Sequence, residues 1–85
     1  MSDPLRVRVL FFASYAEWLG RDDVELTLSG SVSVGDVVRR VRSILPGGDR
    51  LPERPLVALN QAHARLEAAV ADGDELAFLP PMAGG

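Results

Sequence analysis

The sequence predicts an α+β fold in which a mixed sheet packs on one main helix. Three observations support this class: two segments with strand-like alternation open the chain, one strongly amphipathic helix follows, and short apolar strands fill the remainder. At 85 residues the chain has room for one domain with one core. Its 47% hydrophobic and 25% charged residues are ordinary for a folded globular protein.

The first strand is predicted over residues 5–12, where side chains alternate between two faces. One face carries Val9 and Phe11 together with Leu5 and Val7, and it is the candidate core face. The other face begins with arginines but turns apolar at its far end. That end carries Leu10 and Phe12.

A short first helix and a second strand are expected next. Residues 14–17, Ser-Tyr-Ala-Glu, match a capping box in which Ser14 would cap the helix, and Gly20 suits its end after Leu19. Val24, Leu26 and Leu28 then alternate with polar residues as a second strand.

The main helix begins with another capping box, formed by Ser33 and Asp36. Apolar residues follow at helical spacing, which indicates a helix with one buried face. This stripe consists of Val34, Val37, Val38, Val41, Ile44 and Leu45. The basic residues Arg39, Arg40 and Arg42 lie away from the stripe and are interpreted as a solvated face.

The last third of the chain is predicted to hold short strands, after a loop-like stretch up to about Pro55. A strand is expected over residues 56–59, a reversal at Asn60-Gln61, and a weaker strand or turn over residues 66–70. The turn Asp72-Gly73-Asp74 leads into a final strand over residues 75–79.

The first and last strands are the most hydrophobic, so we expect them side by side at the centre of the sheet. With one principal helix after the second strand, this arrangement is the β-grasp, or ubiquitin-like, roll. The predicted organisation is a β-grasp domain over residues 1–79 followed by a flexible C-terminal tail over residues 80–85, ending in Gly-Gly.

The tail is the segment that indicates function. Pro80 and Pro81 remove two backbone donors and stiffen the exit from the last strand, although a ligand for a proline-binding module is another interpretation. Because glycine has no Cβ, Gly84 and Gly85 could enter a tunnel too narrow for other residues. The tail would then present the Gly85 carboxylate to another protein's active site, as a substrate does.

Composition and charge narrow the possible functions. The net charge of −3 argues against nucleic-acid binding, and the lack of cysteine excludes disulfides and thiolate nucleophiles. All nine basic residues are arginine, so the chain offers no lysine on which a covalent modifier chain could be built. No basic leader with an apolar stretch opens the sequence and no run approaches membrane-spanning length, so we expect a cytoplasmic protein that binds no membrane.

Three other motifs favour structural interpretations. Asp72, Asp74 and Glu75 are better read as part of a turn than as a metal site, because the spacing of a calcium loop is missing. His63 is the only histidine, and a surface or partly buried polar role is favoured over catalysis. Residues 46–48, Pro-Gly-Gly, end a helix and have no following lysine, unlike a phosphate loop.

Three segments resemble the small, sulfur-carrying subunits of molybdopterin synthase, at matching intervals over the whole chain. They are residues 10–13 (LFFA), residues 58–61 (ALNQ) and residues 72–85 (DGDELAFLPPMAGG). The Phe-x-Pro-Pro-x-x-Gly-Gly ending is the most specific part. The sequence departs from the commonest pattern at Leu79, where a second aromatic is frequent, and at Met82-Ala83, where valine with serine or threonine is frequent.

The resemblance implies a mechanism in which Gly85 carries the sulfur and Gly84 gives clearance. A ubiquitin-activating-like adenylyltransferase would adenylate the Gly85 carboxylate with ATP, and a persulfide sulfur donor would convert it to a thiocarboxylate. The tail would then enter the large subunit of molybdopterin synthase, within a heterotetramer, and pass sulfur to cyclic pyranopterin monophosphate to form the dithiolene. No cofactor would bind stably to this chain, because ATP is used by the activating partner, and the catalytic groups would belong to the partners.

The predicted partner interface is the sheet face opposite the core, near the tail. It comprises Leu10, Phe12, His63, Ala77, Leu79, Pro80, Pro81 and Met82, with His63 at the rim. An alternative is that a loop of the monomer covers Phe12 and Leu79. Alternative functions are a carrier for thiamine, tungsten-cofactor or cysteine synthesis, a ubiquitin-like conjugation tag, and a non-catalytic adaptor.

Overall fold

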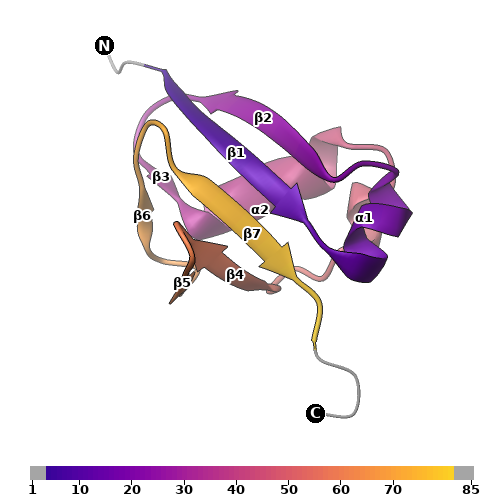
Figure 1. The fold of residues 1–85 in the computed structure, drawn as a ribbon. Helices are drawn as coiled ribbons and strands as arrows, with labels where there is room; N and C mark the ends of the chain where they lie inside the picture. Colours follow the sequence, from indigo (N-terminus) through magenta and orange to yellow (C-terminus); the bar gives the residue numbers. More distant parts are fainter. Residues whose placement is uncertain (1–3, 82–85) are drawn as a thin grey trace.

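A computed structural model describes residues 4–81 of the chain (Figure 1). The elements, in chain order, are β1 (Leu5–Phe11), α1 (Ala13–Leu19), β2 (Asp23–Leu28), β3 (Val32–Ser33), α2 (Val34–Ile44), the 3₁₀ turn η1 (Gly48–Arg50), β4 (Leu56–Leu59), β5 (Ala62–Ala64), β6 (Ala69–Val70) and β7 (Glu75–Leu79).

The main sheet has the strand order β2-β1-β7-β4-β5. Strands β1 and β7 pair in parallel at its centre, whereas the other neighbouring strands are antiparallel. Figure 1 shows these two central strands in front of α2, which crosses behind the sheet. The predicted β-grasp arrangement and the central position of the first and last strands are therefore confirmed.

The core lies between the sheet and α2, and strand alternation decides which residues enter it. On β1 and β7 the buried side chains include Val9, Phe11, Leu76 and Phe78. The rings of Phe11 and Phe78 meet edge to face, with centroids 5.8 Å apart. From α2 the buried side chains are Val34, Val37, Val38 and Val41.

The capping box predicted for α2 is present. The Ser33 hydroxyl accepts a hydrogen bond from the Asp36 amide at 3.1 Å, and the Asp36 carboxylate accepts one from the Ser33 amide at 2.9 Å. Arg39 also donates to the Asp36 carboxylate. The hydrogen bond from the Ser33 backbone, followed by the one from Arg39, lowers the pKa of Asp36 below its ordinary value of 3.8.

The capping box predicted at Ser14 is wrong. Helix α1 begins at Ala13, so its cap is Phe12, and no side chain caps it. The reason is that β1 runs directly into the helix, which starts before Ser14 can occupy the cap position. Gly20 ends the helix in the left-handed conformation, with its amide bonded to the Ala16 carbonyl, as expected.

The predicted helical stripe of α2 is wrong at Ile44, which is 47% exposed. After Val41 the core-facing position passes to Leu45, four residues later, which packs against the core. Arg42 is less solvated than its predicted role implies. Its Nε donates to the Leu51 carbonyl at 2.9 Å, which ties α2 to the loop after it.

The edge of the sheet was predicted incompletely. Asn60 and Gln61 form the expected reversal, both with positive φ, but it leads into β5, which the sequence does not indicate. Residues 66–70 were expected as a weak strand or turn. Only Ala69–Val70 is a strand there, and it pairs with β3 in a separate two-stranded sheet.

Two adjacent phenylalanines test the division of the sheet into faces. We expect Phe11→Asp to destabilise the fold by about 3 to 5 kcal/mol or more, because it removes a buried ring and buries an unpaired charge. Phe12→Asp should cost about 1 kcal/mol or less, because Phe12 is 45% exposed. Thermal melts followed by circular dichroism measure both, and equal melting of the two variants would contradict the division.

The lowered pKa of Asp36 predicts a pH dependence. Its charge stabilises the fold above the ordinary pKa of 3.8, and this contribution is lost as the pH falls through the lower, folded-state pKa. Asp36→Asn should therefore be less stable than the parent at neutral pH by about 0.5 to 1 kcal/mol at low salt. Urea unfolding at neutral pH and at a series of pH values below 3.8 measures the difference, which should shrink as the pH falls. A gap that persists at the lowest pH would show that the charge is not its source.

Candidate functional site: the apolar patch beside the end of β7

The outer face of the sheet, opposite α2, carries a row of side chains that runs across four strands. In the strand register Leu10 lies opposite Ala77, Ala77 opposite Ala58, and Ala58 opposite His63. Directly opposed residues of neighbouring strands share a face. Leu10, Ala58 and Ala77 are partly exposed, and His63 is exposed at the β5 end of the row.

A second apolar group lies next to this row, one step toward the end of β7. Leu79 lies opposite Leu56, which is 53% exposed, and Leu79 is partly exposed. Phe12 follows β1 with extended backbone angles (φ −121°, ψ 153°), so the alternation continues and its side chain shares the face of Leu10. We call Leu10, Phe12, Leu56, Ala58, Ala77 and Leu79 the apolar patch.

The other end of the same face is charged. Arg8 lies opposite Glu25 on one side and Glu75 on the other, and its Nε is 3.8 Å from the Asp23 carboxylate. Cross-strand pairs of opposite charge suit a solvated sheet surface. The outer face is therefore divided, and its apolar half is the half from which the chain leaves β7.

The structure thus brings together most of the predicted interface residues. Leu10, Phe12, Ala77 and Leu79 share the apolar patch, His63 lies at its β5 border, and Pro80 and Pro81 continue from β7. The expectations for Met82, Gly84, Gly85 and the rest of the tail after Pro81 lie outside the described residues.

Leu56 and Ala58 are members of the patch that sequence reasoning missed. Their strand was predicted correctly, and alternation puts both on one face, but only the register with β7 decides which face. The alternative that a loop of the monomer covers Phe12 and Leu79 is wrong at Phe12, which is 45% exposed, while Leu79 is partly exposed.

The carboxylates of the β6–β7 turn serve the backbone, as the turn interpretation predicts. Asp72 accepts a hydrogen bond from the Arg6 amide at 2.8 Å, and Asp74 accepts one from the Ala71 amide at 2.7 Å. Asn60 donates to Asp74 at 3.0 Å, which fastens the β4–β5 reversal to this turn. Within residues 4–81, no group of three or more His, Cys, Asp or Glu side chains could hold a metal ion.

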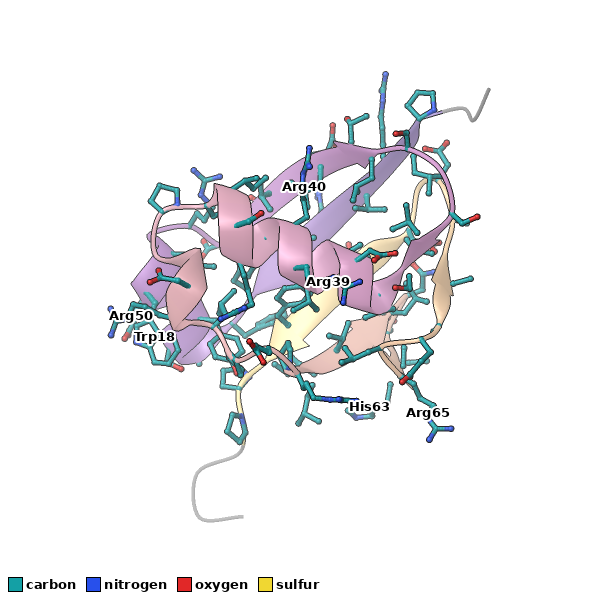
Figure 2. All side chains as sticks on the ribbon, turned by 180° about the vertical axis from the view of Figure 1, so that it is seen from behind. Trp18, Arg39, Arg40, Arg50, His63 and Arg65 are labelled. Atoms are coloured by element: carbon teal, nitrogen blue, oxygen red, sulfur yellow. The ribbon has the colours of Figure 1, made fainter. Side chains whose placement is uncertain are left out.

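The glycines of residues 46–48 allow close packing. A Cβ on Gly47 would lie 2.6 Å from the Trp18 carbonyl oxygen, and one on Gly48 would lie 2.5 Å from the Val41 carbonyl oxygen. Arg50 stacks over Trp18, with 4.9 Å between its Cζ and the ring centroid, and Figure 2 shows the two side chains together. This segment therefore joins α1 to the end of α2.

The two described groups with shifted pKa values lie outside the patch. Burial raises the pKa of Tyr15, and hydrogen bonds from the Ser33 backbone and Arg39 lower the pKa of Asp36. Every helix within residues 4–81 is too short or too polar to cross a membrane. An exposed apolar patch bordered by polar groups is typical of a surface that contacts another protein.

Comparison with known proteins identifies the family. A model described as the ThiS family matches residues 9–85. The chain belongs to the ThiS family. The match includes the apolar patch, the paired prolines and the two terminal glycines.

Relatives of similar length can be aligned with this chain over nearly its full length. The molybdopterin synthase sulfur carrier subunit of Haemophilus influenzae is 37% identical over 84 residues, which cover 93% of this chain and 99% of that protein. The subunit of the same name from Chlamydomonas reinhardtii is 30% identical over 83 residues, covering 95% of this chain and 100% of the relative.

Solved structures of similar fold include a modifier protein and a subunit of an enzyme complex. The crystal structure of small archaeal modifier protein 1 from Haloferax volcanii has a TM-score of 0.82 at 29% identity, covering 92% of this chain and 99% of that one. A chain in the complex of subunits 1 and 2 of molybdopterin-converting factor from Helicobacter pylori has a TM-score of 0.68 at 21% identity, covering 95% and 100%. At 21% identity, the likeness to the Helicobacter pylori chain shows a shared fold and no more.

Proposed function

We propose that this chain is the sulfur-carrier subunit of a molybdopterin synthase. The observation that carries the proposal is the relationship to molybdopterin synthase sulfur carrier subunits over nearly the full length of both chains. The family match continues to Gly85, so it includes the group that would do the chemistry. The apolar patch supplies a docking surface beside the start of the tail.

The terminal carboxylate needs activation before it can accept sulfur. Its charge is delocalised and oxide cannot leave, so the first step is attack of a Gly85 carboxylate oxygen on the α-phosphate of ATP, with release of pyrophosphate. The persulfide sulfur then displaces AMP from the acyl carbon. This leaves an acyl disulfide between Gly85 and the donor. A thiol then attacks the donor's sulfur and forms a new disulfide with it, which releases the terminal thiocarboxylate, the form that donates sulfur.

The partners provide the catalytic groups in this scheme. ATP is bound by a ubiquitin-activating-like adenylyltransferase, and the persulfide is held by a separate donor, so this chain needs no stably bound cofactor. The large subunit binds cyclic pyranopterin monophosphate and receives the tail, within a heterotetramer. The patch and the two prolines orient the tail, because Leu79 belongs to the patch and Pro80 follows it directly.

A second candidate function is protein conjugation. The likeness to small archaeal modifier protein 1 favours it, since that chain has the same fold at 29% identity. An activated Gly85 could acylate a lysine of another protein in place of accepting sulfur. Isopeptide adducts carrying this chain on other proteins would support conjugation, whereas a free thiocarboxylate form supports sulfur transfer.

Activation should be visible in the mass of the intact chain. After incubation with ATP, the activating enzyme and a persulfide donor, we expect one oxygen of Gly85 to be replaced by sulfur. The matched control omits ATP. An unchanged mass with an enzyme that activates a known carrier would rule out the carrier function.

The tail should matter for transfer and not for folding. Deleting Gly85, or replacing Gly84 by Val, should abolish sulfur transfer and leave the melting temperature nearly unchanged, because both residues follow the last strand of the fold. The checks are an assay of molybdopterin formation and a thermal melt. Continued cofactor synthesis with the truncated chain would contradict the proposed role of Gly85.

The patch should bind the large subunit. Phe12→Asp should weaken this binding by about 2 kcal/mol or more, because an aromatic anchor becomes desolvated at an interface. Ile44→Asp is the matched control: Ile44 is 47% exposed, close to the 45% of Phe12, but it lies on α2 across the fold. Titration calorimetry compares them. Equal losses for both variants, or none for Phe12→Asp, would show that the patch is not the docking surface.

A further inference from the structure

A groove opens at the β5 edge of the sheet, next to the apolar patch. Its volume is about 410 Å³, and it is formed by residues 54–57, which lead into β4, and residues 63–67, which lead out of β5. Figure 2 shows His63 and Arg65 beside each other at this edge. We call it the edge groove.

The edge groove is lined by two arginines, Arg54 and Arg65, and by one carboxylate, Glu67. Arg54 and Arg65 are exposed, and neither forms an ion pair with a carboxylate of residues 4–81. By contrast, Arg8, Arg39 and Arg42 each have a carboxylate within 4 Å. The two arginines of the groove are therefore available for another molecule.

A neighbouring hollow adjoins the edge groove. It has a volume of about 350 Å³ and shares Arg54 and Leu66 with the edge groove, while Arg39, Arg42 and Glu53 complete its lining. Arg39 pairs with Asp36 and Arg42 with Glu53. Among the described residues, Arg54 and Arg65 are therefore the arginines of the two hollows that have no carboxylate within 4 Å.

The lining favours a peptide over a bare anion. Pro55 and Val57 are buried beneath the groove, and Leu56 and Leu66 add apolar surface. A free phosphate would use the arginines alone. An extended segment with carboxylates and apolar side chains would use both parts of the lining, because guanidinium groups bind carboxylates bidentately and aliphatic floors accept apolar side chains.

The edge groove is continuous with the apolar patch. Leu56 belongs to both, and His63 lines the groove while lying opposite Ala58 of the patch. A protein bound to the patch could therefore also contact the groove. The two surfaces offer complementary contacts, one apolar and one cationic.

We propose that the edge groove binds an acidic segment of the protein that docks on the apolar patch. This inference rests on the proposed function, in which that protein is the large subunit of molybdopterin synthase. The apolar patch holds the partner, while Arg54 and Arg65 attract its acidic segment and set its orientation. Charges at an interface rim act mainly on the association rate and on its dependence on salt.

A charge-reversal pair with a matched control tests the proposal. Arg54→Glu/Arg65→Glu and Arg40→Glu/Arg50→Glu change the net charge equally, and all four positions are exposed. Arg40 lies on the far side of α2 from His63 and Arg65 (Figure 2). Association with the purified large subunit is measured by stopped flow at low and high salt.

At low salt the groove variant should associate about tenfold more slowly than the parent, and the control should stay within about twofold. The difference should shrink at high salt because screening removes the attraction. Equal slowing by both variants would mean that only net charge matters, and no slowing by the groove variant would mean that the groove is not contacted. Either result overturns the proposal.

A second measurement separates failure of the groove from failure of the proposed function. If the parent chain does not bind the large subunit at all, the proposed function fails, and the groove is tested with a synthetic peptide of glutamate and leucine residues. The peptide should shift the Nε–H NMR signals of Arg54 and Arg65 and leave that of Arg40 unmoved. Equal shifts at Arg40, or equal shifts with inorganic phosphate at the same concentration, would overturn an acidic-peptide site.

Discussion

The parallel pairing of β1 with β7 is the contact on which the rest of the structure depends. It joins the first and last strands of the chain, and it places Phe11 against Phe78 in the centre of the core. The same pairing puts Leu10 opposite Ala77 on the outer face. One register therefore determines the buried face, the exposed patch and the point where the tail leaves the fold.

In this arrangement the residues that stabilise the fold are different from the group that is proposed to react. The core depends on the inward side chains of the central strands and α2, whereas the proposed reactive group lies at the end of a tail that follows the last strand. In the proposed function, the carboxylate would react with a partner while the packing of the core stays as it is. The described surface offers two regions for such contacts, the apolar patch and the edge groove with Arg54 and Arg65.

Much of this was predictable from the sequence. Period-two alternation assigned Phe11 to the core and Phe12 to the surface, and the capping box at Ser33 marked the start of α2, because both signals are local and strong. The site was partly predictable for the same reason, since Leu10, Ala77 and Leu79 follow from strand parity near a distinctive ending.

The parts that could not be predicted depend on contacts between distant segments. Leu56 and Ala58 join the patch only through the register of β4 with β7. Strand β5 is short and rich in alanine, so it lacks a local signal, and the edge groove forms only when residues 54–57 meet residues 63–67. At Ser14 a matching motif failed because the preceding strand leads into the helix two residues too early for it, with Phe12 at the cap position.

A single-turnover experiment tests whether this chain donates sulfur from its C-terminus. The chain is prepared with a Gly85 thiocarboxylate and mixed with the large subunit and cyclic pyranopterin monophosphate, and the intact mass is followed with time. We expect the chain to return to its carboxylate form while dithiolene product appears, with two chains consumed for each product. A thiocarboxylate that persists in the presence of a competent large subunit and its substrate would show that the chain does not donate sulfur.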